Sequence, residues 1–527
     1  MSFHKPVPMT IETDHPAHQR PVLVTGATGY VGGRLIPRLL ESGYHVRAIG
    51  RSLRKIGSRP WAHHPRLASV EGDLMDRASL ENAMAGCGSA FYLVHSMDSA
   101  EEDFEAADRK AAENMVGAAA AVGLERIVYL GGLGETQHAS VSPHLKSRHE
   151  VAEILQSGSV PTTVLRAAML LGSGSASFEI LRYLVDRLPI MFLPRWANTP
   201  CQPIAIRNVL TYLEGCLAHE ATIGKTFDIG GPNILSYRQL IKIYAEEANL
   251  PRRALFPMPF LTPLISAYLL QFVTPVPASI AIPLFEGLRT PVVCRNNDIR
   301  AIIPQRLLSC RETMGLALTR IQQERVETSW SDAGALFLPE WTYLGDAEYA
   351  GGTIVDCSYR VFLKTTVEDL WHSISRIGGV RGWYFLNSLW RIRGDLDRLF
   401  GGIGLQRGRR DPSRLQIGDA LDFWRVLEAE APHRLLLLAE MKLPGEALLE
   451  FRITALDNGE VELKQIARFL PRGLGGILYW YAMMPFHAWI FGGMLRAIAK
   501  SIDQPILRGP ERFFPDDSLS DRPDINP

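Results

Sequence analysis

Three glycines near the amino terminus have a spacing that suits the binding of a diphosphate. Gly26, Gly29 and Gly32 follow the apolar run from Val22 to Thr25, and a helical pattern begins directly after them. Without side chains, Gly26 and Gly29 let the backbone approach a pyrophosphate, whose charge the amides at the start of the helix would stabilise. Gly32 lets the helix pack closely on the strand. The alternative is a glycine-rich turn without a ligand.

The residue after the second apolar run indicates which dinucleotide this loop would bind. Arg51 stands in place of the carboxylate that binds the ribose hydroxyls of NAD, and an arginine suits the 2′-phosphate of NADP. We therefore expect NADP, with NAD still possible; the alternative is a solvated basic loop that includes Arg54, Lys55 and Arg59. Further candidate cofactor contacts are Thr28, Tyr30 and Val31 between the glycines, Asp73 and Leu74 after the third run, and Val94 and His95 after the fourth.

The glycine loop lies in a region, from Pro21 to about Ile154, that alternates apolar runs with helical stretches. This alternation is typical of strand–helix–strand units that form a parallel sheet. Six strands are predicted, over Val22 to Thr25, His45 to Ile49, Ala68 to Glu71, Ala90 to Val94, Arg126 to Leu130 and Thr162 to Leu165. The predicted fold class of this part is α/β, a Rossmann-type doubly wound parallel sheet.

The second half of the chain has a different pattern. Thr366 is the predicted cap of a short helix, because Asp369 follows three residues later. Turn residues then separate four short runs of alternating polarity, which predict a meander of antiparallel strands. These strands cover 419–428, 434–442, 447–456 and 460–469, and a last helix covers about 475–500.

An antiparallel sheet wrapped around a long helix leaves a cavity that generally takes apolar ligands. Several charged residues lie on the predicted strands, where they either face solvent or line that cavity. We assign most of them, including Asp419, to the solvent-facing side. Asp422 and Trp424 are the candidate residues of a substrate pocket.

The composition describes a globular protein with balanced charge. Its 527 residues are 46% hydrophobic and 21% charged, with 56 Lys and Arg against 56 Asp and Glu. Zero net charge removes the overall attraction to a polyanion, so we expect no nucleic-acid partner. The six cysteines form no Cys-x-x-Cys pair, which favours reduced, buried thiols in a cytoplasmic protein. No histidine group has metal-ligand spacing, so no metal is expected.

We place domain boundaries where the composition changes. Residues 1–20 lack the apolar stretch of a secretory signal and are predicted to be a disordered tail, as are residues 508–527. Residues 21–321 are predicted to form an NAD(P)-binding domain with a substrate-side extension, and residues 322–352 a connecting segment. Residues 353–507 are predicted to form the second domain. The oligomeric state stays open.

Two uncharged segments raise the question of contact with a membrane. Residues 254–285 contain six prolines and cannot form one continuous helix. Residues 475–495 are long enough to span a bilayer and lie between Arg472 and Arg496, but Pro485 interrupts them.

We favour a buried helix of the second domain for residues 475–495. Tyr479, Trp480 and Trp489 would then fill its core. Interfacial contact and a true membrane span are the alternatives. We expect a cytoplasmic protein, with peripheral contact at the inner surface of the membrane left open.

Several segments of the sequence resemble a known family. One set resembles an atypical, NmrA-like short-chain dehydrogenase/reductase; it comprises Thr25 to Gly32, Gly72 to Leu74, Phe91 to Ser96 and Phe227 to Pro232. A second set resembles a bacterial subgroup in which this domain is fused to an α+β, START-like helix-grip domain of unknown function. That set comprises Leu93 to Met97, Thr274 to Pro277, Asp422 to Val426, Met441 to Gly445 and Tyr479 to Tyr481.

This resemblance also shows where the chain departs from the family. Short-chain reductases carry a serine after the fifth strand and Tyr-x-x-x-Lys on the next helix, whereas here the strand ends in Leu130 to Leu133 and His144 and Arg148 replace Tyr and Lys. A histidine with an ordinary pKa of ~6.5 donates a proton near neutrality, so His144 is the candidate acid. Arg148 would hold cofactor oxygens. Ser142 and Lys146 substitute if the alignment shifts by two residues, and a noncatalytic surface histidine is the alternative.

The leading hypothesis is an oxidoreductase that presents the nicotinamide of NADP to a small hydrophobic substrate held with help from the START-like domain. The alternative is a noncatalytic redox sensor or assembly factor, as the resemblance allows for this fold. A weaker alternative is a lipid or quinone carrier with a structural cofactor.

Overall fold

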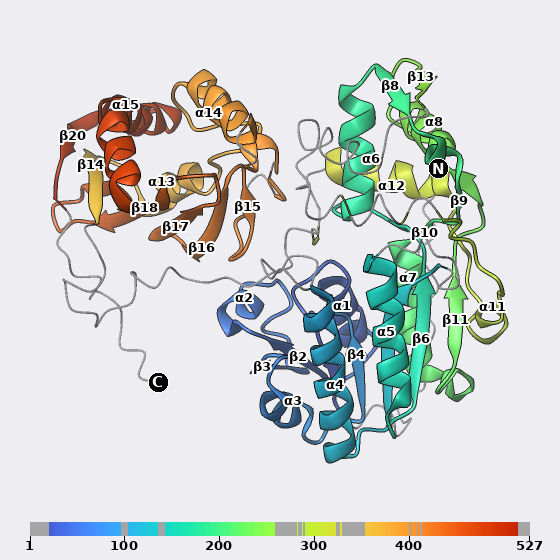
Figure 1. Cartoon of the computed structure of the whole chain (residues 1–527). Helices are drawn as coiled ribbons and strands as arrows, with labels where there is room; N and C mark the ends of the chain where they lie inside the picture. Colours follow the sequence, from blue (N-terminus) through green and yellow to red (C-terminus); the bar gives the residue numbers. More distant parts are fainter. Residues whose placement is uncertain are drawn as a thin grey trace, which may run out of the picture. The chain divides into compact units, whose positions relative to one another are not determined.

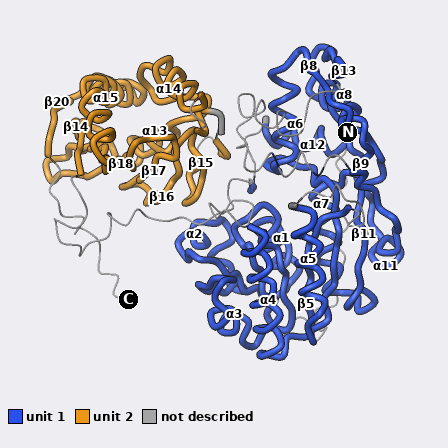
Figure 2. The backbone as a smooth tube through the Cα atoms, in the orientation of Figure 1, with its two compact units in different colours: residues 1–273, 278–334 blue, residues 274–277, 335–527 orange. Residues whose placement is uncertain are grey.

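The computed structural model divides the chain into two compact units (Figure 1). Residues 1–273 and 278–334 belong to the first unit, and residues 274–277 and 335–527 belong to the second (Figure 2). The described residues are 20–95, 104–134, 143–258, 282, 287, 290–322, 327–328, 354–399, 402–407, 409–411 and 414–514. Most of the predicted amino-terminal tail, the proline-rich segment and the connecting segment lie outside them.

A seven-stranded parallel sheet forms the centre of the first unit and confirms the predicted fold class. Its strands run in the order β11-β6-β5-β4-β1-β2-β3, in which the chain reverses direction beside β1. The strands are β1 Val22–Val24, β2 Val46–Gly50, β3 Leu67–Glu71, β4 Ser89–Tyr92, β5 Arg126–Gly132, β6 Thr162–Ala167 and β11 Thr226–Ile229. The six predicted strands are all present, and β11 is added at the edge.

Helices cover both faces of this sheet (Figure 1). Side chains of α1 and α7 form the core on one face, and side chains of α3, α4 and α5 form the core on the other. The helices are α1 Gly32–Glu41, α2 Leu53–Gly57, α3 Arg77–Met84, α4 Phe104–Val122, α5 Pro143–Ser157 and α7 Ile206–Ala218, with a 3-10 turn η3 Glu220–Thr222.

An extension with its own core follows the sheet. It contains β7 Leu170–Leu171, α6 Ala176–Arg187, β8 Ile190–Leu193, η2 Arg195–Asn198, β9 Pro200–Cys201, β10 Ile204–Ala205, β12 Leu235–Ser236, α8 Tyr237–Glu247, β13 Ala254–Pro257, α11 Ile299–Ile302 and α12 Cys310–Gln322. Its strands pair as three short ribbons, β10 with β7, β12 with β9 and β13 with β8.

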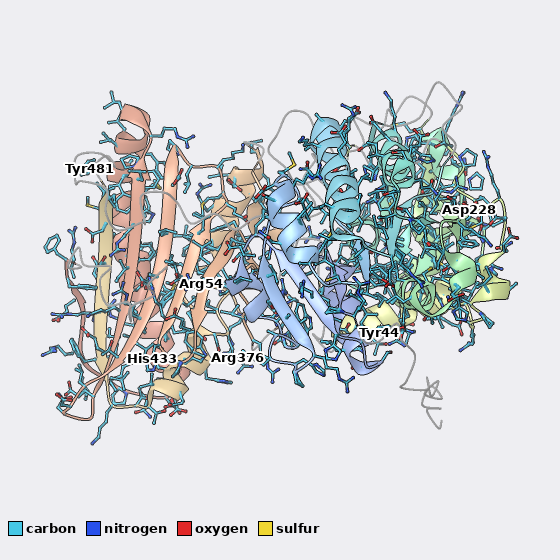
Figure 3. All side chains as sticks on the ribbon, turned by 90° about the horizontal axis from the view of Figure 1, so that it is seen from below. Tyr44, Arg54, Asp228, Arg376, His433 and Tyr481 are labelled. Atoms are coloured by element: carbon cyan, nitrogen blue, oxygen red, sulfur yellow. The ribbon has the colours of Figure 1, made fainter. Side chains whose placement is uncertain are left out.

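Asp228 links two strands of the sheet to each other and to the extension. Asp228 of β11, labelled in Figure 3, accepts hydrogen bonds from Arg166 of β6 at 2.6 Å and from the backbone amide of Arg295 at 2.9 Å.

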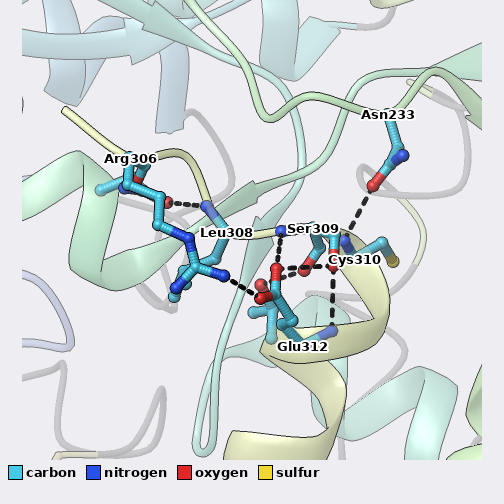
Figure 4. Close-up of polar contacts among 8 residues, drawn as sticks. Asn233, Arg306, Leu308, Ser309, Cys310 and Glu312 are labelled. Atoms are coloured by element: carbon cyan, nitrogen blue, oxygen red, sulfur yellow. Dashed lines mark hydrogen bonds and ion pairs between the residues drawn. The ribbon is translucent and has the colours of Figure 1, made fainter. Parts of the chain in front are cut away.

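The start of α12 is fixed by polar contacts of its own (Figure 4). Ser309 and Glu312 cap it reciprocally, with hydrogen bonds of 2.8 and 3.2 Å.

A second seven-stranded sheet, antiparallel throughout, forms the second unit. Its order is β15-β16-β17-β18-β19-β14-β20, and the long helix α15 packs on β19, β14 and β20. The elements are β14 Val355–Leu363, α13 Val367–Ile374, α14 Asn387–Leu399, η6 Gly404–Arg407, β15 Ala420–Leu421, β16 Trp424–Glu430, β17 Arg434–Ala439, β18 Gly445–Ala455, β19 Val461–Pro471, α15 Gly473–Ser501 and β20 Ile506–Arg512. The predicted meander, the final helix and the Thr366 cap of α13 are confirmed.

Two predictions about the end of the chain are wrong. Residues 508–512 are not part of a tail, because they belong to β20, which pairs with β14. Trp489 does not fill the core, because its side chain is 56% exposed, whereas Trp480 is buried. Among the described residues, no helix combines the length and the hydropathy needed to cross a bilayer.

Asp422 lies in the turn between β15 and β16, with a positive φ of 55°. Its buried carboxylate accepts from the indole of Trp383 at 2.9 Å and from the amide of Gly379 at 3.2 Å. Burial raises the pKa of Asp422 to about 6, although these hydrogen bonds oppose the shift. Asp419 is also buried, beside Arg410 at 3.0 Å, so its predicted solvent-facing position is wrong.

Asp422 should make the second unit less stable as the pH rises. The folded unit binds this proton more tightly than the unfolded chain, so stability is lost between the unfolded pKa of 3.8 and the folded pKa of about 6. Relative to Asp422→Asn, the free energy of unfolding of the wild type should fall by about 2 kcal/mol between pH 4 and pH 7. Urea titrations followed by tryptophan fluorescence measure this difference. Asp395→Asn, which changes an exposed carboxylate, is the control, and an equal pH dependence of both variants would contradict the assignment.

Candidate cofactor and catalytic site

The glycine loop follows β1 and is held against the end of β4. Gly26 has a φ of 63°, and a Cβ there would lie 2.8 Å from the carbonyl oxygen of Leu93. The hydroxyl of Thr25 accepts from the amide of Leu93 at 3.0 Å and donates to the carbonyl of Phe91 at 3.1 Å. A Cβ on Gly32 would lie 2.2 Å from the carbonyl oxygen of Gly26. Only glycine permits this close approach of helix and loop.

The first turn of α1 is suited to an anion. Val31 is its N-cap residue, which supplies no side-chain hydrogen bond, and the turn contains no acidic residue. Amides at such a helix start stabilise a phosphate charge through their dipoles. Thr28, Gly29 and Tyr30 beside it are only partly buried. These residues fit the pyrophosphate of a dinucleotide.

The other predicted cofactor contacts lie along the same edge of the sheet. Arg51 follows β2, Asp73 and Leu74 follow β3, and Val94 follows β4. Because neighbouring parallel strands end on one side, these residues share the carboxyl edge with the glycine loop. Val94 is within 3.4 Å of a Cβ built on Gly26.

The basic segment after β2 is only partly solvated. Arg51 is exposed, but Lys55 and Arg59 are buried, so the solvated-loop alternative does not describe them. Asp73 is engaged in a local turn, where its carboxylate accepts from the amide of Met75 at 3.0 Å.

Three side chains from separate elements form a buried hydrogen-bonded chain near this edge. His95 follows β4, Asp108 lies on α4, and His144 lies in the first turn of α5. His95 Nδ1 is 2.7 Å from the carboxylate of Asp108, and His95 Nε2 is 2.8 Å from His144 Nδ1. Ser147 donates to the same carboxylate oxygen at 2.9 Å. We refer to Asp108, His95 and His144 as the histidine relay.

The carboxylate fixes the tautomers of both rings. An ionised Asp108 accepts a hydrogen bond from His95 Nδ1–H, so a neutral His95 has a lone pair on Nε2. His144 then donates from Nδ1, which leaves a lone pair on its Nε2. In this state His144 is a base, and one further proton on the relay turns it into an acid.

The electrostatics of the relay differ from the sequence-based expectation. Burial, the Arg148 guanidinium and His95 hold the pKa of His144 well below its usual 6.5, and Asp108 only partly opposes them. Burial and Arg148 also lower the pKa of His95. The expectation that His144 has an ordinary pKa and donates its proton readily near neutrality is therefore wrong. At neutral pH the relay is in its basic state.

Arg148 occupies the position expected for the family lysine, one turn after His144. One of its amino groups donates to the carbonyl of Leu130 at 3.3 Å, while its Nε is buried and has no hydrogen-bond partner among the described residues. A ribose or phosphate oxygen would satisfy this donor. Lys146, the alternative to these positions, is exposed, and Ser142 lies outside the described residues.

The sequence interpretation missed Asp108 and Ser147. Asp108 lies on the buried, alanine-rich face of α4 with Ala111, Ala112 and Met115. A carboxylate on such a face is costly unless it is paired, and this was the available signal. Asp422 and Trp424 lie in the second unit, where both are buried.

Comparisons with known proteins agree with this geometry. Residues 26–182 match the family model described as NAD(P)H-binding, and residues 351–494 match one described as a protein of unknown function (DUF2867). The amino-terminal unit is an NAD(P)H-binding domain. The START-like character of the second domain stays a prediction, as does the NmrA-like character of the first.

The curated relatives match the first unit in part. A dihydroflavonol 4-reductase from Zea mays is 38% identical over 89 residues, which are 16% of this chain and 25% of the relative. NADH dehydrogenase [ubiquinone] 1 alpha subcomplex subunit 9 from Arabidopsis thaliana is 24% identical over 247 residues, 45% of this chain and 60% of the relative. A nucleoside-diphosphate-sugar epimerase structure from Staphylococcus aureus has a TM-score of 0.47 at 15% identity and covers 56% of this chain and 99% of its own. The chain thus spans a quarter to three fifths of these curated relatives.

The NAD(P)H-binding domain should depend on the absence of a side chain at residue 32. In Gly32→Ala, the new methyl group would overlap the carbonyl of Gly26 and force α1 away from the loop. We expect NADPH affinity to fall at least ~10-fold in isothermal titration calorimetry. Gly57→Ala, where a Cβ meets nothing within 4 Å, is the control. Wild-type affinity in a folded Gly32→Ala variant would contradict the assigned phosphate site.

Proposed function

We propose that the protein is an NADP-dependent oxidoreductase in which His144 exchanges the proton of the reaction. The observation that carries this proposal is the chain of short hydrogen bonds from Asp108 through His95 to His144. It stands at the position where the resembled reductases have their catalytic tyrosine. A histidine that served only for packing would not need a buried carboxylate to set its tautomer.

The bound cofactor supplies hydride chemistry: NADPH and a proton convert a carbonyl to an alcohol and NADP⁺, or the reverse. His144 Nε2 gives the proton to the carbonyl oxygen or removes it from the hydroxyl group. His95 and Asp108 are positioning residues, which hold the ring of His144 and stabilise the extra proton on the relay. Arg148 cannot exchange a proton and would bind cofactor oxygens through its unpartnered Nε.

The preference for NADP over NAD rests on Arg51. Its side chain is exposed at the carboxyl end of β2, beside the strand that carries the glycine loop. This is where the adenosine ribose lies in Rossmann domains, and a guanidinium there pairs with a 2′-phosphate.

We further propose that the second unit helps to hold a small hydrophobic substrate, in the way of a START-like domain. Gln465 supports this idea. It lies on the same face of β19 as the buried Leu463 and Ala467 and is itself fully buried. Neither polar atom of its amide has a partner among the described residues. The indole nitrogen of the buried Trp424 also has no partner there. Such groups in an apolar core suit a ligand that has one polar end.

A noncatalytic redox sensor or assembly factor is the second candidate. The observation in its favour is the loss of the serine, tyrosine and lysine that the resembled reductases use. In that case the relay would be a buried structural network, and cofactor binding would occur without turnover. A carrier with a structural cofactor is the third candidate, supported only by Gln465.

The cofactor preference can be tested with Arg51→Ala. We expect NADPH affinity to fall about 10- to 100-fold while NADH affinity stays nearly unchanged, because only NADPH has the 2′-phosphate. Arg66→Ala is the matched control, since Arg66 is also exposed but lies before β3, at the opposite edge of the sheet. Equal losses for both cofactors would remove the argument for NADP.

The catalytic assignment can be tested with a panel of quinones, enones and aldehydes in the presence of NADPH. His144→Phe should abolish turnover and leave NADPH binding intact, and His149→Phe, on the same helix but outside the relay, should keep both. Asp108→Asn should lower kcat by about 10²- to 10⁴-fold. Binding of NADPH by the wild type without oxidation by any panel member would favour the sensor.

The pH profile separates a positioning role of Asp108 from a merely structural one. Reduction needs the protonated relay, so its rate should fall as the pH rises through the relay pKa, which lies below the ordinary 6.5. The rate of alcohol oxidation should rise over the same pH range. Asp108→Asn removes the charge that raises the relay pKa, so the pH profiles of both reactions should move to lower pH. An unmoved profile would contradict the positioning role.

A further inference from the structure

One face of α15 is apolar and exposed over four turns. Eight residues form it, at the helical spacing of three and four: Leu474, Ile477, Leu478, Tyr481, Ala482, Pro485, Phe486 and Trp489. The six large side chains among them are between 40% and 71% exposed. Figure 3 labels Tyr481 on this helix. We refer to these eight residues as the apolar face.

The apolar face reverses the usual pattern of a surface helix, which presents polar residues to solvent. From residue 474 to residue 489 it extends about 22 Å along the helix axis. The second half of the same helix buries its large apolar side chains in the usual way, since Met494, Leu495 and Ile498 are fully buried in the core. An exposed surface of this size and composition marks a site of interaction.

A second exposed stripe lies on α14. Ile392, Leu396 and Leu399 follow one another at intervals of four and three residues and are about half exposed or more. Phe385, just before α14, packs edge-to-face on Trp489 with ring centroids 6.0 Å apart. The start of α14 therefore adjoins the apolar face.

Cations surround these apolar residues. Arg472 precedes the apolar face and Arg496 follows it, and both are exposed, as is Arg391 on α14. No carboxylate lies on α15. Asp395 of α14 is 3.7 Å from Arg398, and Glu446 of β18 is 3.8 Å from the largely exposed Arg472. The charge pattern complements an anionic surface.

We propose that the apolar face docks on an anionic lipid membrane, with the arginines at the level of the headgroups. Its only side-chain hydrogen-bonding groups are the hydroxyl of Tyr481 and the indole of Trp489, the two residue types that favour the membrane–water interface. A protein partner would need about one hydrogen bond per 100–200 Å² of interface, and the apolar face offers few groups for them. The helix would lie in the interface, as amphipathic anchors do.

Flotation of the full-length protein with vesicles tests this proposal. We expect binding to vesicles of phosphatidylcholine and phosphatidylglycerol, with weaker binding to pure phosphatidylcholine and at raised salt. Leu478→Glu should weaken binding at least ~10-fold, because it places a charge among the inserted side chains. The exposed position of Leu478 leaves the fold intact, which circular dichroism checks.

Val380→Glu is the matched control, because Val380 is a fully exposed apolar residue of the same unit outside both helices. It should bind vesicles like the wild type. The proposal is overturned if the wild type binds neither kind of vesicle, or if both variants lose binding equally. It is also overturned if sedimentation shows a dimer that Leu478→Glu separates, since the partner would then be a second copy of the chain. None of these results depends on NADPH binding or turnover.

Discussion

The contact between α1 and the loop before it is the constraint on which the site depends. The backbone of Gly32 approaches the carbonyl of Gly26 so closely that a methyl group has no room. This contact places the first turn of α1 at the carboxyl end of β1, in the middle of the sheet. The neighbouring strands then bring Arg51 and His95 to the same edge. A wider separation of helix and loop would move the phosphate site while leaving the histidine relay in place.

The two units manage buried charge differently. In the first, the carboxylate of Asp108 accepts hydrogen bonds from His95 and Ser147, both within 2.9 Å. In the second, the carboxylate of Asp422 accepts hydrogen bonds from an indole and a backbone amide, and burial raises its pKa to about 6. A carboxylate beside a histidine can stabilise a proton on the ring, whereas for Asp422 the cost of burial exceeds the effect of its neutral hydrogen-bond donors.

The sequence was sufficient where short-range patterns decide the structure. The alternation of apolar runs with other segments predicted the strands of both sheets, and the spacing of the glycines predicted the phosphate loop. It was insufficient where distant segments meet. His95 and His144 are 49 residues apart, and their contact depends on how α4 and α5 pack on β4 and β5. The low pKa of His144 follows from burial, which no local pattern reveals. The uncharged run of α15 has a similar composition along its length, yet its first half exposes an apolar face while most of its second half is buried.

The departures from the family pattern are consistent with one another. A tyrosine needs a neighbouring cation to lower its pKa, and a lysine supplies it. A histidine has the opposite need, because Arg148 lowers its pKa further. The buried carboxylate of Asp108 opposes this effect in part through its hydrogen bond with His95. Without Asp108, the pKa of the relay would fall still further below 6.5, and under the proposed function a still smaller fraction of the relay would carry the proton that reduction needs.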